Sequence, residues 1–473
     1  MSEEGFQRIH VIGFAGHRSM NDSAAIKAAM LAVLREWRDE STGTCIGRSS
    51  TAAGADLLFL EACRDLGIPF TVVLPFPEER FSEDFDDPPD WARAKTLMAE
   101  AASVDVVPGN EVAPEAYHLA AREVLDTSDR MLCVWDGKAA RGVGGTAESV
   151  AEARERRMPL RIIDSATAVI VAPENANSRS APGDHFTALP TAGTVAELFD
   201  KLDRRASNAA PRSRWFSAGS ITLNQLATVT SAILIAFKLG ENAAPAVKFV
   251  IVLIAGCLPW VGARFRISEA WREDRLLTEL LRSLLASHSF APPFRSFAAD
   301  LFEDDAAFLR AAAWRLIPQR QNWAAARGAY INERLDGQIA YLTRQGELAA
   351  KRLRTFRIVF RVSSGAAMLL GAAAIIAGIQ GSKIGEGPVS FWLIFLPTIL
   401  PAVAAWCLAM IPLFEHQRRA RTYLRVAQQL ADKRTELLEA KCFTTAAAVV
   451  ASCERLLLAE LWEWAGTRGQ RKR

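Results

Sequence analysis

Residues 8–18 read RIHVIGFAGHR, a short apolar run that ends in a turn containing Gly16. A helix-length amphipathic stretch, 23–39, follows it, and a second apolar run begins at Thr44. Continuous apolar runs separated by amphipathic helices predict parallel strands that are buried on both faces of a sheet. The opening stretch therefore predicts the first strand, turn and helix of a doubly wound, Rossmann-like α/β domain.

The same alternation continues to about residue 164 and defines the rest of this domain. Strands are predicted at 8–14, 44–48, 70–74, 104–107, 130–135 and 160–163. Helices are predicted at 23–39, 54–66, 91–101, 114–124 and 146–156. Ligands of such sheets bind at the carboxyl ends of the strands, so the turns that follow the strands are the places where a site is expected.

Composition and charge exclude several classes of protein. A chain of 473 residues is too long for one core, so two or three domains are expected. The formal net charge of +3 gives no reason to expect direct nucleic-acid binding. Seven dispersed cysteines without a CxxC pair indicate reduced thiols, and no metal site or cofactor is predicted. The acidic start, MSEEGFQRIH, lacks the basic region of a secretory signal, so the N-terminal domain is expected in the cytosol.

After Trp215 the chain becomes strongly apolar and predicts an all-α integral membrane domain with about four transmembrane helices. The apolar segments lie at 216–237, 249–263, 358–379 and 389–414; the second spans a bilayer only if 243–247 joins it. Basic residues flank both pairs of segments, so both termini and the middle segment are expected in the cytosol. Long cytosolic helices are predicted over 267–350 and 422–464. The alternative, buried hairpins of a soluble bundle, is disfavoured because core helices rarely stay apolar around their whole circumference.

Two of the turns after the predicted strands carry glycine together with a charged residue. Gly16-His17-Arg18 follows the first strand, where backbone amides favour an anion and Arg18 can clamp a phosphate. The second turn, 49–56, contains Gly54 and Asp56, and Asp56 can accept a hydrogen bond from a ribose or a base. Both turns also have a purely structural explanation, since a tight turn needs glycine anyway and Asp56 can simply satisfy first-turn amides.

The third turn is the most specific of the three. Asp136 and Gly137 follow the fifth strand, and a glycine run then opens the next helix, with Gly142, Gly144, Gly145, Thr146 and Glu148. Bare amides, the positive end of the helix dipole and the Thr146 hydroxyl together predict a phosphate-binding turn. Glu148 lies one turn into the helix, where it either contacts a ribose or only complements the helix dipole.

The three turns together resemble the SLOG superfamily, which is named for relatives in the DNA-processing and LOG phosphoribohydrolase families. The resemblance covers about residues 7–164 and lies in GHR after the first strand, GAD at the second helix, and WDG with GVGGTAE at the fifth strand. It implies a nucleotide-binding domain at 1–168, either an enzyme or a sensor of a nucleotide-derived messenger. The enzymatic LOG pattern is GGxGTxxE with a separate arginine, and GVGGTAE departs from its spacing, which favours binding over hydrolysis.

A second resemblance begins at Tyr330. The string YINERLDGQIAY (330–341), a basic run, a transmembrane hairpin and a closing helix around 453–462 are similar to the SLATT family, a two-transmembrane effector module associated with SLOG and nucleotidyltransferase operons. It implies a domain at 324–473 whose spans are 358–379 and 389–414. The other expected parts are a linker with a short helix at 169–214, a first hairpin at 215–266 and cytosolic helices at 267–323.

The two resemblances imply a multi-pass sensor-effector of the bacterial inner membrane that acts in antiviral (abortive-infection) defence. A nucleotide second messenger, of the cyclic or ADP-ribose type, is the expected ligand, and the enzyme that makes it is an indirect partner. The lipid bilayer is the direct partner, which a homo-oligomer of the chain is expected to perturb or permeabilise.

Two alternatives remain open at the level of the sequence. One is a membrane-tethered LOG-like nucleotide N-glycosidase, in which Glu148 acts as acid or base and Arg18 binds phosphate. The other is a constitutive channel or scaffold whose N-terminal domain is structural. The departure of GVGGTAE from the enzymatic pattern argues against the first of them.

Overall fold

The computed structural model describes residues 6–107, 113–139, 144–175, 189, 192–236, 244–264, 267–299, 301–302, 305–379 and 388–466. Parts of the predicted linker, 176–188 and 190–191, lie outside these described residues. The chain forms two compact units. The first comprises Met1–Phe199, Leu280–Ala326 and Lys441–Leu458, and the second comprises Asp200–Glu279, Arg327–Ala440 and Ala459–Arg473.

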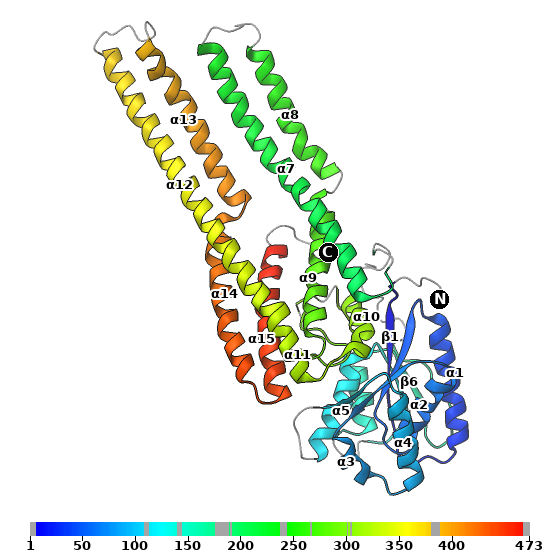
Figure 1. Cartoon of the computed structure of the whole chain (residues 1–473). Helices are drawn as coiled ribbons and strands as arrows, with labels where there is room; N and C mark the ends of the chain where they lie inside the picture. The colour runs from blue at the N-terminus through cyan, green and yellow to red at the C-terminus, as the bar shows by residue number, and fades with distance from the viewer. Residues whose placement is uncertain are drawn as a thin grey trace. The chain divides into compact units, whose positions relative to one another are not determined.

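The first unit contains a six-stranded sheet (Figure 1). Its strands are β1 (Ile9–Gly16), β2 (Thr44–Ser49), β3 (Phe70–Leu74), β4 (Val104–Val106), β5 (Arg130–Trp135) and β6 (Leu160–Asp164). Their order is β4-β3-β2-β1-β5-β6 and every neighbouring pair is parallel, which confirms the predicted N-terminal α/β domain. Because β2, β3 and β4 extend from one side of β1 and β5 and β6 from the other, the carboxyl ends of β1 and β5 form the switch point at which doubly wound sheets bind ligands.

Helices cover both faces of this sheet. α1 (Ser23–Glu40), α2 (Ala55–Asp65) and α4 (Pro88–Glu100) share one core with it, whereas α5 (Ala113–Thr127) and α6 (Thr146–Glu155) share a second. The sequence of α1 explains its position: Asp22 caps the first turn by accepting from the Ala25 N–H at 2.9 Å, and one face buries Ile26, Met30, Val33, Leu34 and Trp37. The sequence does not predict α3 (Glu78–Phe81) and η1 (Ser82–Asp84), because so short and polar a segment shows no helical periodicity.

Segments far along the chain complete the first unit. Leu280–Ala326 includes α10 (Ala306–Leu316) and η4 (Ile317–Gln319), and the ring of Phe308 lies 5.6 Å from that of Phe6. The rings of Phe290 and Phe443 stack at 6.3 Å, and Phe443 begins α15 (Phe443–Gly466). Both α15 and α9 (Ile267–Ser287) cross the boundary between the two units, so each is a continuous helical connection between them.

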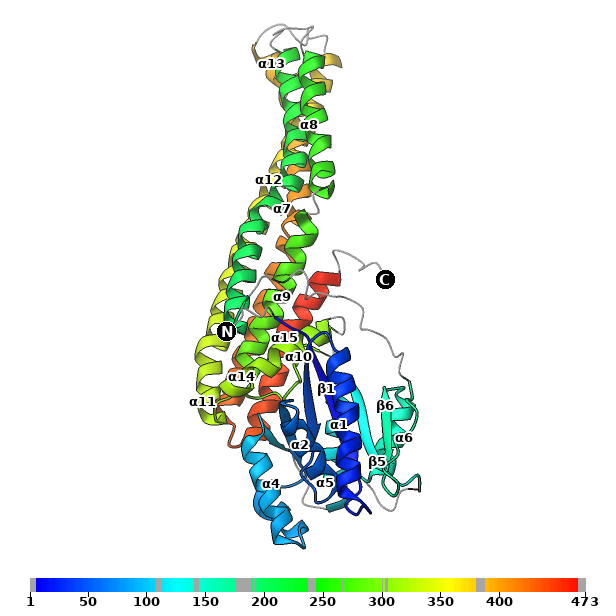
Figure 2. The same cartoon turned by 90° about the vertical axis from the view of Figure 1, so that its right-hand side faces the viewer.

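The second unit is helical and holds the apolar segments. α7 (Val195–Ala236) and α8 (Ala244–Arg264) run side by side, as do α12 (Asp336–Ile379) and α13 (Pro388–Leu413) (Figure 1; Figure 2 gives the perpendicular view). α14 (His416–Glu439) packs along the first half of α12, where Arg434 pairs with Asp336 at 2.6 Å. α12 follows α11 (Trp323–Ala329) and a π-helical segment, η5 (Tyr330–Leu335). α7 is one continuous helix where the sequence predicts a short helix, a polar stretch and a span.

Two helices of the described chain are long and apolar enough to cross a membrane, Trp323–Ile379 and Phe395–Glu439. Only 6% and 22% of their apolar windows are buried, so neither has the surroundings of a core helix in a soluble protein. α8 contains a shorter apolar stretch, Pro245–Val261. The helical C-terminal region with two apolar helices is thus as expected, whereas the four spans remain a prediction.

Candidate ligand site at the carboxyl edge of the sheet

The first and third predicted turns meet across the switch point. β1 ends at Gly16, which lies opposite Val134 of β5, and the His17 N–H continues the ladder by donating to the Val134 carbonyl at 3.1 Å. The imidazole Nε2 of His17 lies 3.2 Å from the Asp136 carboxylate and accepts from the Asp136 N–H at 3.2 Å. Asp136 in turn accepts from the Lys138 N–H at 3.0 Å, which closes the turn around Gly137 at φ +73°. His17 and Asp136 therefore sit where a ligand of a doubly wound sheet is expected.

The second predicted turn packs directly on the first. The Ala55 N–H donates to the His17 carbonyl at 3.1 Å. A Cβ on Gly54, at φ +97°, would lie 2.2 Å from the Arg18 carbonyl oxygen, and one on Gly16 would lie 2.4 Å from the Ala55 Cβ. Both glycines are therefore required by the close approach of two backbones. The three turns form one continuous surface at the ends of β1, β2 and β5.

Asp56 lies beneath this surface and is only 6% exposed. The Ser49 hydroxyl donates to its carboxylate at 2.8 Å. Burial raises the pKa of Asp56 to about 7, and the Ser49 hydrogen bond and the Arg18 charge oppose that increase. In the same turn Thr51 is fully buried, and its hydroxyl has no hydrogen-bond partner among the described residues. Thr51 is thus a donor at this edge that sequence reasoning missed.

The third turn is closed by its own glutamate. Gly144 has φ +80°, and its N–H donates to Glu148 Oε2 at 2.6 Å. The other carboxylate oxygen of Glu148 lies 3.0 Å from Nδ1 of His118, on α5. Gly145 precedes the first residue of α6, and Thr146 is buried, at 8% exposed. Gly142 lies outside the described residues, so only the later part of the predicted glycine run is placed.

Arg18 belongs to a second group of polar side chains at the same edge. Its guanidinium donates to the Asp84 carbonyl at 3.4 Å, and the Tyr117 hydroxyl donates to the Asp84 carboxylate. Burial and Asp84 together raise the pKa of Tyr117 to about 12, so its hydroxyl keeps its proton. The ring of Tyr117 meets that of Phe76 edge-on at 5.6 Å.

Tyr117 and His118 were not predicted as site residues. They belong to an amphipathic helix, α5, that carries no glycine turn or motif of its own. Their position at the edge follows from α5 running antiparallel to β5, which places the first turns of α5 beside the carboxyl ends of the strands. A Cβ on Gly144 would lie 2.7 Å from the His118 backbone nitrogen, so the glycine turn packs directly on these two residues.

Taken together, these features define a chain that joins an N-terminal parallel-sheet α/β domain to a helical region with two helices long and apolar enough to cross a membrane. Residues 330–464 match the family described as SMODS and SLOG-associating 2TM effector domain 1, so the chain carries a SLATT_1 domain. The predicted SLATT resemblance is confirmed over these residues, and the domain fits an effector role in antiviral defence and membrane perturbation. No curated protein matches the chain. The match does not include the sheet, for which the SLOG resemblance stays a prediction.

Proposed function

We propose that this chain is a sensor-effector of the bacterial inner membrane. A nucleotide-derived messenger binds where the turns after β1, β2 and β5 meet, and binding changes the SLATT_1 domain so that the membrane is perturbed or permeabilised. One observation carries the proposal: the three turns converge at the switch point, joined by the contact of His17 with Asp136, in the same chain as a SLATT_1 domain.

The third turn supplies the phosphate-binding part of the proposal. Glu148 occupies the Gly144 N–H, next to the N-terminus of α6, where a phosphate oxygen is well placed to accept instead. Arg18 lies near enough to Tyr117 to lower its pKa, and Gly144 packs against the Tyr117 backbone. A phosphate bound at Gly144 is therefore close enough to Arg18 to be attracted by its positive charge. A phosphate displaces Glu148 from the amide, and the released carboxylate is then available to accept from a ribose hydroxyl.

α5 connects this site to charged side chains further along the same helix. His118 in its first turns contacts Glu148, whereas Glu123 and Asp126 near its other end pair with Arg295 at 2.8 and 3.1 Å. Glu123 also contacts the guanidinium of Arg48 at 3.4 Å. A ligand that breaks the His118–Glu148 contact therefore acts on a helix that is held at its other end by arginines.

Arg295 belongs to the segment that leads to the effector. Leu280–Ala326 contributes Arg295, Arg310, which reaches Asp129 at 2.5 Å, and Arg320, which reaches Asp105 at 3.3 Å. The segment begins within α9, and its Phe290 stacks on Phe443 of α15. Residues 443–464 of α15 lie within the SLATT_1 match, and the helix runs from the first unit into the second. A movement of α5 is thus transmitted through this segment to α9 and α15.

Ligand binding is tested with the purified full chain and a panel of cyclic and ADP-ribose-type nucleotides, read by thermal unfolding. At a ligand concentration of about one hundred times Kd, binding to the folded state stabilises it by about 2.7 kcal/mol, which raises Tm measurably. Gly145→Asp places a negative charge at the start of α6 and should abolish the increase. The matched control is Thr96→Asp at an exposed position of α4, which should retain the increase. No stabilisation by any nucleotide, or equal loss in both variants, contradicts the proposal.

A second candidate function is supported by the contact between Glu148 and His118. A carboxylate 3.0 Å from an imidazole is an arrangement used for acid–base chemistry, as an N-glycosidase requires. Release of free base from a bound nucleotide by the purified chain, lost in Glu148→Gln, favours this enzyme over a sensor. Binding without base release favours the sensor. A channel that opens equally with and without any nucleotide favours the constitutive alternative.

A further inference from the structure

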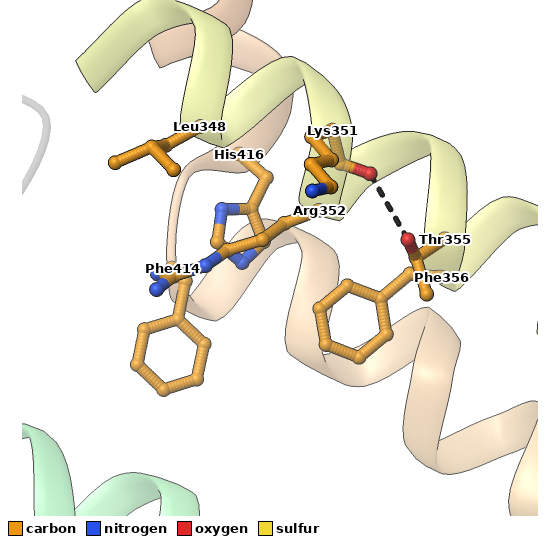
Figure 3. Close-up of a pocket in the computed structure, with 7 residues that line it drawn as sticks. All are labelled: Leu348, Lys351, Arg352, Thr355, Phe356, Phe414 and His416. Carbon is orange, nitrogen blue, oxygen red and sulfur yellow. Dashed lines mark hydrogen bonds between the residues drawn. The ribbon is translucent and has the colours of Figure 1, made fainter. Parts of the chain in front are cut away.

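A pocket of about 490 Å³ lies in the second unit, between α12 and the turn that joins α13 to α14 (Figure 3). Lys351, Arg352 and His416 line it with polar groups. Leu348, Phe356 and Phe414 give it apolar walls. The turn is tight, since Glu415 between the last two lining residues has φ +53°. The pocket is far along the chain from every residue of the proposed nucleotide site.

The charge of the pocket is positive. Among the described residues, those that line it include a lysine and an arginine but no aspartate or glutamate. Glu415, next to His416 in the chain, faces Arg419 at 3.8 Å. The Thr355 hydroxyl, which also lines the pocket, donates to the Lys351 carbonyl of its own helix at 3.1 Å. An anion that enters therefore meets an ammonium and a guanidinium without an opposing carboxylate in the lining.

His416 adds a polar group to the aromatic part of the wall. Its ring stacks on Phe356 at 5.6 Å and on Phe414 at 5.7 Å. Burial, Arg352 and Arg419 lower the pKa of His416, which favours the neutral ring with its one N–H donor. Figure 3 shows the Arg352 side chain beside this ring. The pocket thus combines cationic donors with an aromatic surface.

The position of the pocket along α12 suits a ligand that has one charged end and one apolar end. Lys351 and Arg352 lie just before the apolar part of the helix, and Ile358 and Val362, about one and two turns beyond Thr355, are 52% and 64% exposed. On α13, Leu408 is 56% exposed. A molecule with an anionic head and apolar chains can place its head in the pocket and its chains along these side chains.

We propose that the pocket binds the phosphate-bearing headgroup of an anionic phospholipid. The Lys351 ammonium and the Arg352 guanidinium bind the phosphate oxygens, and the His416 N–H donates a third hydrogen bond. Phe356 and Phe414 cover the glycerol, and the acyl chains lie against the exposed side chains of α12 beyond Phe356. The inference rests on the membrane association of the SLATT_1 domain and not on nucleotide sensing.

The test uses the purified full chain in a neutral detergent and follows thermal unfolding. The additives are short-chain phosphatidylglycerol, phosphatidylcholine with the same chains, and inorganic phosphate at equal concentrations. Phosphatidylglycerol should raise Tm with saturation, whereas phosphatidylcholine and inorganic phosphate should leave it unchanged. An equal effect of inorganic phosphate identifies a free-anion site and overturns the lipid assignment, as does an equal effect of phosphatidylcholine.

Two double variants distinguish lipid binding in the pocket from a general attraction of anionic lipid to basic residues on α12. Lys351→Gln/Arg352→Gln removes two charges from the lining and should raise the half-saturating concentration of phosphatidylglycerol by about tenfold or more. Arg354→Gln/Arg357→Gln removes two exposed charges from the same part of α12 and should change it less than about threefold. Equal changes in both variants overturn the proposal. Arg352→Lys, which keeps the charge and the helix, should bind within about fivefold of the natural chain, so a fold defect in the first variant leaves the test intact. None of these variants alters the nucleotide site, so nucleotide stabilisation should persist in all of them.

Discussion

The two ends of α5 hold their charged side chains in different surroundings. At the N-terminal end, His118 and Glu148 have side chains that are 33% and 36% exposed. Near the C-terminal end, Glu123 contacts Arg48, whose side chain is 0% exposed. A polar contact that is partly open to solvent contributes little stability and can exchange a partner for a ligand, whereas a buried charge that loses a partner is costly. The difference indicates that one end is suited to ligand exchange and the other to rigid attachment.

The largest expected effect on stability comes from replacing Arg48, the buried arginine near the C-terminal end of α5. Arg48 contacts Asp105 at 3.5 Å, Glu123 at 3.4 Å and the Thr71 hydroxyl at 3.0 Å, and it lies 5.0 Å from the Phe294 ring centre. Arg48→Met leaves the two carboxylates without this partner and should lower the free energy of unfolding by about 3–5 kcal/mol. Thermal unfolding of the full chain measures the change.

The control for that variant is Arg38→Met on α1, where the side chain is 44% exposed. It should change stability by less than about 0.5 kcal/mol. A similar decrease in Tm for both variants would show that the Arg48 contacts are no stronger than surface ion pairs.

The carboxyl edge of the sheet also contains one buried carboxyl group, Asp56, whose ionisation should make the stability of the protein depend on pH. The pKa of Asp56 is raised from 3.8 to about 7 in the folded protein, so the folded protein binds this proton more tightly than the unfolded chain does. The stability that this tighter proton binding contributes is fully present below pH 3.8 and is lost as the pH rises through 7. Asp56→Asn can still accept from Ser49 but cannot ionise. As the pH rises from 5 to 8, the free energy of unfolding of the variant should therefore increase by about 2–4 kcal/mol relative to that of the natural chain.

Thermal unfolding of both proteins across that pH range measures this gain. Exposed Asp86→Asn serves as the control and should give a difference that hardly depends on pH. A constant difference for Asp56→Asn as well would mean that the Asp56 carboxyl ionises as it does in the unfolded chain.

A smaller effect on stability is expected at two glycines, which separate the cost of a close backbone contact from the cost of a positive φ alone. Gly54→Ala combines φ +97° with a Cβ 2.2 Å from the Arg18 carbonyl oxygen, and it should cost about 2–3 kcal/mol and weaken ligand binding. Gly67→Ala shares a positive φ, +65°, but no atom of the part of the chain that the structure describes lies within 4 Å of the new Cβ, and it should cost about 1 kcal/mol. If chemical denaturation gives equal costs, the contact between the first two turns is not a close one.

The smallest effect on stability is expected at the exposed end of α5. His118→Ala removes a pair that is about one-third exposed and should change the free energy of unfolding by less than about 1 kcal/mol. Calorimetric titration with a nucleotide that stabilises the natural chain should nonetheless give a change in Kd of about tenfold or more. An unchanged Kd would place the ligand away from α5.

The extent to which the sequence predicts these features depends on how local they are. The sheet was predictable because runs such as RIHVIGF, followed by an amphipathic helix, reveal their period within a few turns of chain. The glycine turns were predictable for the same reason. The association of His118 with Glu148 was not, because it depends on the strand order and on the packing of α5 beside β5.

Long-range packing also explains what was missed elsewhere. Nothing near Arg48 in the sequence marks it as buried among Asp105, Glu123 and Phe294, which lie 57 to more than 200 residues further along the chain. The attachment of Leu280–Ala326 to the sheet likewise rests on side chains that pair across the fold, such as Arg310 with Asp129. The pocket at Arg352 and His416 requires the turn between α13 and α14, which no local pattern predicts.

The most direct test of a ligand-controlled membrane effector is dye release from liposomes that contain the purified full chain. A nucleotide that raises Tm of the natural chain is added, and the release is compared with that of Gly145→Asp in the same lipid. The account predicts release that begins on nucleotide addition with the natural chain and does not occur with the variant. Nucleotide binding with unchanged dye retention in the natural chain would contradict it.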